Sequence, residues 1–248
     1  MRALVLILGT LLVCASSASA DVCLKHHIHT DGYYFGGETS PPEDSDYEVW
    51  LAGSKMSVVL ETRTVVFDLD ANLLTFINHD DSTYAETTLP LDWRNLLSEA
   101  DAARVLMFQT EGTVKDPGEA RETRKVGERE CVGQEMTTWI PYEGTRYNET
   151  DTRMWLSTDI PFDLETYEAL KTHNLRLVNL KEGLLEELKE ARGYPMAEES
   201  DRYIKGFSIR STDEVVEISE EEPAYDVYSA PEGFSKKDKL SLQDLRGR

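Results

Sequence analysis

The feature that most constrains the fold is a series of short strand-like segments in the first half of the chain. Between residues 55 and 62, the apolar Met56, Val58 and Leu60 alternate with residues of the opposite face, which is typical of a strand with one buried side. Turn-prone residues separate the segments. The expected strands are residues 47–51, 55–62, 64–69, 73–77 and 83–89. Such closely spaced strands predict an antiparallel meander rather than a βαβ crossover.

Two later stretches change to a helical spacing of apolar residues. Residues 91–107 form one expected helix with Asp92 as its N-cap, and residues 163–192 form the most periodic segment of the chain. Gly193 ends the second stretch, and Gly183 indicates a break, so two helices are an alternative to one. The fold class that we expect is α+β: a curved antiparallel sheet with helices covering its concave face.

The other segments add strands and connections to this sheet. Residues 32–46 are turn-rich and predict an exposed loop, and Asp116-Pro117-Gly118 marks a turn. Residues 235–248 are polar and are expected to fray. The further expected strands are residues 22–29, 126–140, 152–157, 202–209, 213–218 and 224–228.

The first twenty residues predict an exported protein. A basic start is followed by an apolar run that is too short to span a bilayer and by Ala18-Ser19-Ala20, a secretory cleavage pattern. We therefore expect a signal peptide at 1–20, a single α+β domain at 21–234 and a polar C-terminal tail at 235–248. The expected location is the periplasm or the secreted medium. No second long apolar run predicts a transmembrane segment.

Cleavage of this leader would discard Cys14 and leave Cys23 and Cys131. A lipid anchor at Cys14 is disfavoured, because Val13 stands where a lipobox has a small residue. An even pair of cysteines in an exported chain predicts one disulfide. No C-x-x-C motif points to a redox pair, so we expect a structural bridge. In the chain-entropy model, a bridge that encloses about 100 residues stabilises a protein by about 4.7 kcal/mol.

The charge of the chain excludes some partners. It carries 26 basic and 47 acidic residues, a formal net charge of −21. A field of that sign repels phosphate backbones, so nucleic acid is not an expected partner. Many of the acids lie after Glu198. We interpret them as a solvated surface and not as a calcium site, because no calcium loop with its turn glycine is present. A protein partner in the envelope, with a basic surface, is an alternative function.

A histidine cluster near the start of the mature chain is a candidate for chemistry. On a strand, His27, His29 and Asp31 would share one face, and H-x-H-x-D resembles the metal-binding loop of metallo-β-lactamase-fold hydrolases. Gly32 stands where that family has its next histidine. A metal-dependent hydrolase is therefore a second alternative, and histidines on a half-exposed strand are the simpler interpretation. No nucleophile elbow, P-loop or dinucleotide fingerprint is present. We expect a non-enzymatic protein without a cofactor.

Apolar residues on the expected strands give the leading functional hypothesis. Each of them is interpretable as ordinary core, but together they permit a cavity, because a curved sheet that helices cover only partly leaves apolar surface for a small ligand. The candidate lining residues are Trp50, Met56, Val58, Leu60, Phe67, Phe76, Tyr84, Trp139 and Trp155. The expected ligand is a hydrophobic small molecule, a lipid or an acyl chain.

Several of these segments resemble a bacterial envelope family of unassigned function. The resemblance covers Trp50 and Met56, the strands at 66–68 and 73–78, and residues 82–86, and it returns at 193–195 and 231–234. That family is similar in architecture to the LolA-like lipoprotein carriers. The resemblance implies an open half-barrel of antiparallel strands, with helices on the concave side, that binds acyl chains or another hydrophobic partner. The long acidic insertions depart from lipoprotein carriers, so shuttling of lipoproteins is not implied.

Two findings would count against a carrier of hydrophobic ligands. One is an interior that is fully packed beneath the helical segment at 163–192. The other is a distance between Cys23 and Cys131 that is too long for a disulfide.

Overall fold

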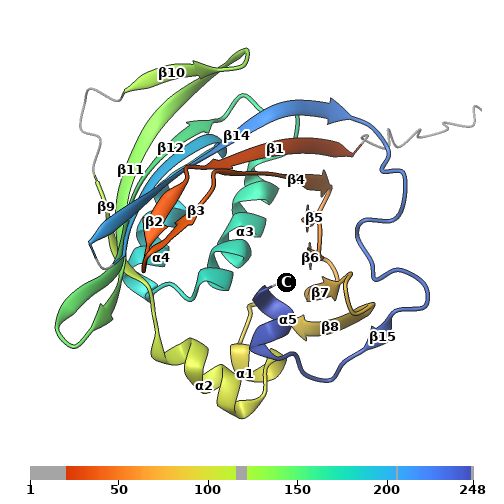
Figure 1. Ribbon diagram of the computed structural model, residues 1–248. Helices are drawn as coiled ribbons and strands as arrows, with labels where there is room; N and C mark the ends of the chain where they lie inside the picture. Colours follow the sequence, from red (N-terminus) through yellow and green to blue (C-terminus); the bar gives the residue numbers. More distant parts are fainter. Residues whose placement is uncertain (1–20, 116–121, 205, 247–248) are drawn as a thin grey trace, which may run out of the picture.

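The computed structural model describes residues 21–115, 122–204 and 206–246. The expected signal peptide and the turn at Asp116-Pro117-Gly118 lie outside these ranges. Within them, thirteen strands form one sheet in the order β10-β11-β12-β13-β14-β1-β4-β5-β6-β7-β8-β15, with β9 pairing to β11 (Figure 1). Neighbouring strands run antiparallel except β15, which lies parallel to β8. The α+β open half-barrel that we expected is confirmed.

The meander follows the sequence pattern closely. Its strands are β4 (Glu43–Ala52), β5 (Lys55–Val59), β6 (Arg63–Asp68), β7 (Leu73–Asn78) and β8 (Thr83–Thr88). The alternation along β5 separates two environments. Met56 and Val58 pack with the main core, whereas the Ser57 hydroxyl on the opposite face donates to the Val227 carbonyl at 2.7 Å. One face of this half of the sheet is therefore the core face, as the period of two requires.

The N-terminal strand lies in the middle of the sheet. β1 (Val22–Thr30) pairs with β4 on one side and with β14 (Phe207–Glu220) on the other. The strands beyond β14 are β13 (Tyr194–Ile204), β12 (Thr145–Ser157), β11 (Arg129–Tyr142), β10 (Thr123–Val126) and β9 (Glu111–Val114). β1 thus joins the meander to the long strands of the second half of the chain.

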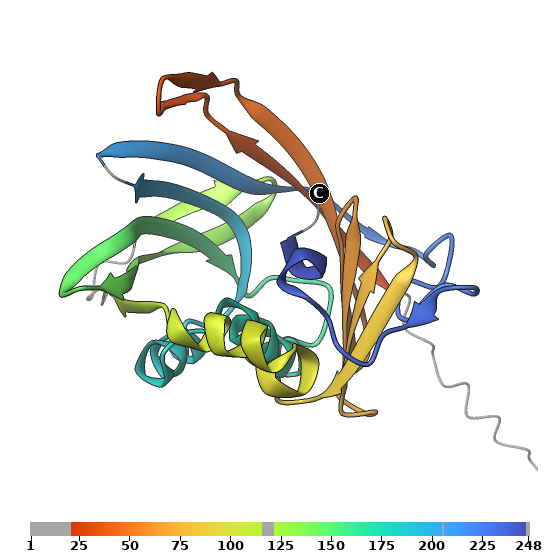
Figure 2. The same cartoon turned by 60° about the horizontal axis from the view of Figure 1, so that its bottom comes forward.

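The helices lie across the opening of the curved sheet (Figure 2). The expected helix at 91–107 is two helices, α1 (Trp93–Leu96) and α2 (Glu99–Met107). Asp92 caps the first as expected, since its side chain accepts a hydrogen bond from the Arg94 amide. Ser98 caps the second by accepting from the Asp101 amide, so a new helix begins there. The residue between them, Leu97, has an extended backbone.

The long periodic segment also breaks into shorter helices. Asp163 caps α3 (Leu164–Leu175), which continues as the 3₁₀ helix η1 (Arg176–Val178). Asn179 then adopts a left-handed conformation, with φ of 49°, and α4 (Glu182–Glu190) follows. A left-handed residue cannot continue a right-handed helix, so the alternative of two helices is the correct one.

Three expectations about local structure are wrong. Residues 32–46 do not form a loop, because β2 (Tyr33–Phe35) and β3 (Glu38–Ser40) pair as a hairpin before β4 begins. The expected strand at 202–209 contains the turn between β13 and β14, where Gly206 has φ of 89°. Residues 224–228 have no strand, and Val227 instead packs with Cys23 and Trp50.

The C-terminal segment is packed and not frayed along the part that the structure describes. It contains β15 (Ser235–Lys236) and α5 (Leu242–Arg246). Leu240 is buried in a cluster with Trp93, Leu96 and Leu97, and the Lys239 ammonium donates to the Arg94 and Asn95 carbonyls. In Figure 1 this segment returns to the inside of the curved sheet, so that α5 lies near its centre.

The disulfide expected between Cys23 and Cys131 is absent, and this prediction is wrong. Both thiols are buried and free. Cys23 lies in β1 and Cys131 in β11, with β14, β13 and β12 between them. Four spacings between neighbouring strands amount to about 19 Å along the sheet. A disulfide joins Cα atoms at about 4.4–6.8 Å, so the two residues cannot be bridged in this fold.

Burial replaces the bridge in holding these residues. Cys23 packs with Trp50 and Val227, and burial raises the pKa of its thiol to about 12. Cys131 belongs to the main core, and burial raises the pKa of its thiol as well. Both are therefore protonated at neutral pH and behave as small apolar side chains. No helix in the described ranges is long and apolar enough to cross a membrane.

Candidate ligand-binding cavity

A cavity of about 600 Å³ lies on the concave side of the sheet. Strands β1 and β4–β7 form one wall, β13 and β14 contribute one end, and residues of α1, α2, α3 and α5 close the other side. Its volume falls in the range of about 300–1,000 Å³ that is typical of small-ligand sites. Its apolar lining includes Val49, Met56, Val58, Leu60, Val65, Phe76, Trp93, Leu177 and Leu245. Its polar lining includes His26, Tyr47, Arg63, Tyr167, Tyr194 and Asp213.

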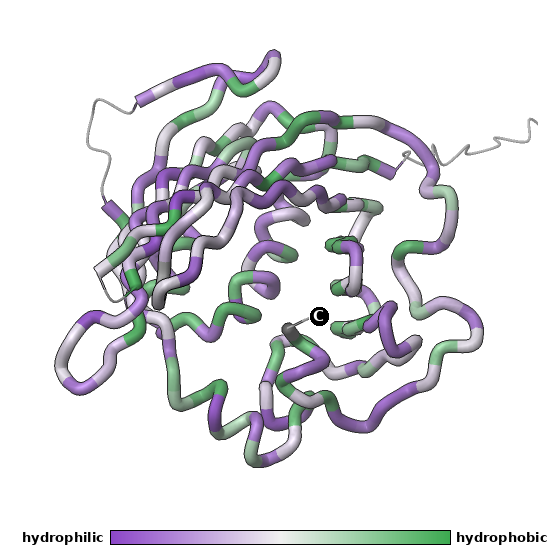
Figure 3. Tube along the Cα trace, in the orientation of Figure 1, coloured by the Kyte–Doolittle hydropathy of each residue, from purple (hydrophilic) through white to green (hydrophobic). Residues whose placement is uncertain are grey.

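The sheet wall of the cavity is apolar because of strand register. Val49 on β4 lies opposite Val58 on β5, Val58 lies opposite Val65 on β6, and Val65 lies opposite Phe76 on β7. Directly paired residues point to the same face of a sheet, so these four side chains form one row across four strands. In Figure 3, hydrophobic positions occur along α3 and along β5–β7, which lie on opposite sides of the interior. A ligand in this space would contact hydrocarbon on both sides.

One end of the cavity holds a buried hydrogen-bonded cluster centred on His26. Only 3 % of His26 is exposed. Its Nδ1 lies 2.8 Å from Oδ1 of Asp213, and its Nε2 lies 2.7 Å from the Tyr194 hydroxyl. Tyr47 donates its hydroxyl to Oδ2 of Asp213 at 2.7 Å and stacks on the imidazole with 4.3 Å between ring centroids. Both carboxylate oxygens of Asp213, whose side chain is 27 % exposed, thus accept hydrogen bonds.

Aromatic rings surround this polar cluster. Tyr194 packs against Tyr167 of α3 with ring centroids 5.0 Å apart, and Phe162 contacts both rings. Burial raises the pKa of the Tyr194 and Tyr167 hydroxyls well above the ordinary value, and burial together with Asp213 does the same to Tyr47. These phenols therefore stay neutral, and Tyr47 and Tyr194 hydrogen-bond to the Asp213–His26 pair.

A second carboxyl lies beside Asp213. Glu198 on β13 is paired directly with Asp213 on β14. Burial, and then the Asp213 charge, raises the pKa of the Glu198 carboxyl to about 7. Like charges on directly opposed positions are destabilising, and a proton on Glu198 relieves the repulsion. This end of the cavity therefore gains or loses one negative charge near neutral pH.

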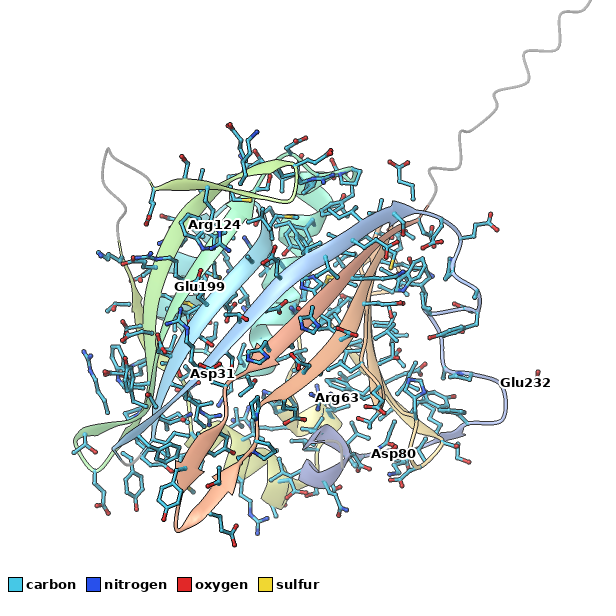
Figure 4. The ribbon with its side chains drawn as sticks, turned by 45° about the horizontal axis from the view of Figure 1, so that its top comes forward. Asp31, Arg63, Asp80, Arg124, Glu199 and Glu232 are labelled. Carbon is cyan, nitrogen blue, oxygen red and sulfur yellow. The ribbon has the colours of Figure 1, made fainter. Side chains whose placement is uncertain are left out.

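Arg63 is the cation of the cavity wall. It begins β6, two residues before Val65, so strand alternation places both side chains on the cavity face. Its guanidinium donates to the main-chain carbonyl of Leu245 in α5. Figure 4 shows Arg63 next to this C-terminal helix. Within the described residues, no carboxylate lies within ion-pair distance of Arg63. The cavity is thus apolar along its sheet wall, with a guanidinium on the face of that wall.

Four of the residues expected from the sequence line this cavity. They are Met56, Val58, Leu60 and Phe76. Phe67 and Trp155 lie in the main hydrophobic core, where neither lines this cavity. The Trp155 ring lies beneath the Arg124 guanidinium at 4.5 Å.

The three other candidates lie away from the cavity. On β4, Val49 faces the cavity, so the neighbouring Trp50 points to the opposite face, where it packs with Cys23 and Val227. Tyr84 on β8 has the Lys236 ammonium 5.9 Å from its ring centroid. Trp139 on β11 is covered by the Arg146 guanidinium at 3.8 Å. These two rings contact cations at the surface of the sheet.

The polar residues of the cavity were not singled out by the sequence. Tyr47, Arg63 and Asp213 belong to no motif, and Tyr194 occurs only in the resemblance at 193–195; their proximity depends on strands far apart in the chain. His26 is different, because alternation along the strand places it on the face opposite to His27 and His29. The histidine cluster therefore divides between the two faces of β1.

His27, His29 and Asp31 lie in a cluster of imidazoles and carboxylates. Within the residues that the structure describes, which include all three, no group of histidine, cysteine and acidic side chains is arranged to hold a metal ion. The shortest contact of each imidazole is with a carboxylate across the strand pair. His27 Nδ1 lies 2.7 Å from Asp46, and His29 Nδ1 lies 2.7 Å from Asp44. Asp44 also lies 3.3 Å from His27 Nε2, and Asp31 lies 3.2 Å from His29 Nε2. The metal-ligand hypothesis stays a prediction.

The comparisons with known proteins concern the fold. No protein-family model matches the chain, and no curated protein matches it. Among solved structures, the chain is similar to a LolA superfamily protein from Nitrosomonas europaea. The two share 8 % sequence identity, the match covers 85 % of this chain and 90 % of that chain, and the TM-score is 0.31.

Proposed function

We propose that this protein binds a hydrophobic ligand, a lipid or an acyl chain, between the concave face of its sheet and its helices. The observation that carries the proposal is the cavity of about 600 Å³ beneath α3, with a row of apolar side chains across four strands. Transfer of a hydrocarbon chain from water to this wall is favourable in proportion to the apolar area that it covers. The interior is therefore not fully packed, which was one condition for a carrier.

The second condition is not met, because Cys23 and Cys131 are free. The disulfide was expected to tie the start of the mature chain to its middle. Pairing of β1 with both β4 and β14 provides that connection without a covalent bond. The proposal consequently depends on the cavity alone and not on the cysteines.

We propose a binding role rather than catalysis, because the histidine and the carboxylate of the cavity are committed to partners inside their own cluster. His26 is bonded at both nitrogens, and Asp213 at both oxygens. A general base needs a free acceptor within reach of its substrate. The expected signal peptide at 1–20 supports action outside the cytoplasm, in the periplasm or after secretion. The resemblance at 66–68, 73–78 and 82–86 supports membership of the envelope family.

The test is to identify what the purified protein retains. Protein purified without detergent is denatured, and the released material is analysed by lipid mass spectrometry. A neutral fluorescent apolar probe is then titrated into the delipidated, refolded protein. We expect a released amphiphile or saturable probe binding with one site per chain. A protein that releases no lipid and binds no apolar probe would refute the proposal.

An acidic interaction module remains the alternative. Binding to a basic partner through surface charges weakens steeply as salt rises, whereas burial of an acyl chain responds little to ionic strength. Measurement of any interaction at low and high salt separates the two functions.

A further inference from the structure

We propose that Arg63 selects the head group of the ligand, so that the cavity takes a single-chain amphiphile with an anionic head, a carboxylate or a phosphate. This inference rests on the proposed function and names the class of ligand for the same cavity. Three observations support it: the position of Arg63 on the cavity wall, the absence of an acidic partner within the described residues, and the distribution of the other charges.

The position of Arg63 suits contact with a head group. Along β6, Arg63 and Val65 both line the cavity, and Val65 belongs to the apolar row that crosses four strands. The distance from Arg63 to Val65 along the strand is about 7 Å, two residues of extended chain. A ligand whose polar end contacts Arg63 can therefore lay its hydrocarbon chain along the apolar row.

The guanidinium has capacity for such a ligand. Arginine carries five N–H donors in a planar fork that matches a carboxylate or phosphate. In the described residues, one of these donors is used by the Leu245 carbonyl, and none meets a carboxylate. The chain as a whole carries a net charge of −21, so Arg63 lacks an acidic partner in a protein with a surplus of acids. A neutral carbonyl leaves the positive charge of Arg63 uncompensated next to an apolar surface.

The Asp213 cluster does not favour a cationic head group. Asp213 already accepts hydrogen bonds from His26 and Tyr47 at its two oxygens. These donors stabilise the Asp213 charge and so weaken its attraction for an ammonium group. Arg63 has no such charged partner within the described residues.

The experiment compares ligands that share one hydrocarbon chain. Dodecanoate, dodecanol and dodecyltrimethylammonium compete with a neutral fluorescent probe for the purified protein, at about pH 8, where a carboxylate is ionised. We expect dodecanoate to bind more tightly than dodecanol by about 10- to 100-fold, the usual effect of a hydrogen bond to a charged group. The ammonium compound should bind no better than the alcohol.

Variants then assign the preference to Arg63. In Arg63→Gln the ratio of dodecanoate to dodecanol affinity should fall close to one. Dodecanol and the probe are both neutral, so any change in the affinity for one should equal the change in the affinity for the other. Arg63→Lys should retain part of the ratio, because the charge remains but the fork is lost. The matched control is Arg104→Gln, which removes the same charge from the exposed face of α2 and should keep both affinities within about threefold of wild type.

The outcomes separate this inference from the proposed function. If the wild-type protein binds dodecanol and dodecanoate equally, or if Arg63→Gln keeps the preference, the role of Arg63 is refuted while the hydrophobic cavity stands. Preference for the ammonium compound would assign the head group to the Asp213 end instead. Failure of all three ligands and of the probe would refute the proposed function, and the inference would fall with it.

Discussion

His26 and Asp213 are 187 residues apart in the sequence, yet Nδ1 of the imidazole lies 2.8 Å from the Asp213 carboxylate in the interior. The pair joins β1, the first strand of the described chain, to β14, the last long strand. Tyr47 from β4 donates to the same carboxylate. Three strands are therefore linked through one acid at the end of the cavity, which couples the stability of the sheet to the shape of the site.

We expect Asp213→Asn to destabilise the protein. An asparagine offers one oxygen in place of two, so either His26 or Tyr47 loses its acceptor in a buried environment. The expected loss is about 1–3 kcal/mol in the free energy of unfolding. Urea unfolding measures this loss. The slope of the free energy of unfolding against urea concentration should stay unchanged if the fold is retained.

Asp46→Asn is the matched control for that change. Asp46 also pairs with a histidine, His27, at 2.7 Å, but its side chain is 79 % exposed. Exposed ion pairs contribute about 0–1 kcal/mol, so this variant should remain close to wild type. Equal losses of unfolding free energy in the two variants would show that the burial of His26 does not make its pair with Asp213 more stabilising than an exposed pair.

Filling the cavity should block ligand binding without unfolding the sheet. Val58 lies in the apolar row, and Val58→Phe adds volume where the hydrocarbon chain would lie. We expect the affinity for a neutral apolar probe to fall at least about tenfold, the loss of roughly 1.4 kcal/mol of contact. Thermal unfolding should change little, because the added ring enters empty space. Val178→Phe adds the same volume at an exposed position and should bind the probe normally. Unchanged binding by Val58→Phe would place the probe outside this cavity.

The fold was predictable where the period of the sequence is short and regular. The alternation of Met56 and Val58 identifies β5 and its core face, and Asp92 and Asp163 identify the starts of α1 and α3. The C-terminal segment was misjudged because its polar composition hid Leu240 and Leu245. Leu240 packs in the buried cluster of α1, and Leu245 lines the cavity, so these two leucines hold the C-terminal segment. A count of apolar residues alone does not reveal such a segment, because only the tertiary fold supplies its partner.

The site was predictable only for its hydrocarbon wall. Apolar residues on alternating strand positions face a core or a cavity in either case, so Val58 and Phe76 could be named in advance. Arg63 could not, since its meaning depends on α5 returning to β6 from the far end of the chain. The disulfide failed for a related reason. Parity and spacing of cysteines do not determine strand order, and three strands separate Cys23 from Cys131.

Reduction should leave the stability of the protein unchanged. Cys23 and Cys131 are buried thiols, and burial raises the pKa of Cys23 to about 12, so neither is a reactive thiolate at neutral pH. We expect both to resist iodoacetamide in the native protein and to be alkylated in denaturant without prior reduction, as read by mass spectrometry. Urea unfolding with and without reductant should coincide. A loss of about 4.7 kcal/mol in the free energy of unfolding on reduction is the value expected for a disulfide that closes a loop of about 100 residues. That result would show that Cys23 and Cys131 are bridged after all.

His27 and His29 should titrate above His79 and His173. The hydrogen bond to Asp46 raises the pKa of His27, and the hydrogen bond to Asp44 raises that of His29. Burial instead lowers the pKa of His79 and His173. A pKa that is raised by folding means that the folded state binds the proton more tightly. The contribution to stability is therefore full below the unfolded value of about 6.5 and is lost as pH rises through the folded pKa.

Imidazole NMR signals followed against pH measure these values directly. Because the two histidines have their shortest hydrogen bonds to different carboxylates, they should respond differently to substitution. Asp46→Asn should lower the pKa of His27 more than that of His29, and Asp44→Asn should have its larger effect on His29. Titration of both histidines at or below 6.5 in the wild-type protein would contradict the cross-strand pairs.

Glu198 should make the protein less stable as pH rises through neutrality. Burial and the Asp213 charge raise its pKa to about 7 in the folded protein, against about 4.3 in an unfolded chain. The folded state therefore holds this proton more tightly, and the resulting stability is present below about pH 4.3 and lost as pH rises through 7. Glu198→Gln remains neutral, so the variant should match wild type near pH 4 and be more stable near pH 8 in urea unfolding. The neighbouring Glu199 pairs with Arg124 (Figure 4) and also with Arg210, so Glu199→Gln should gain nothing at the higher pH. If wild type and Glu198→Gln show the same change in stability between these pH values, Glu198 does not carry a proton beside Asp213.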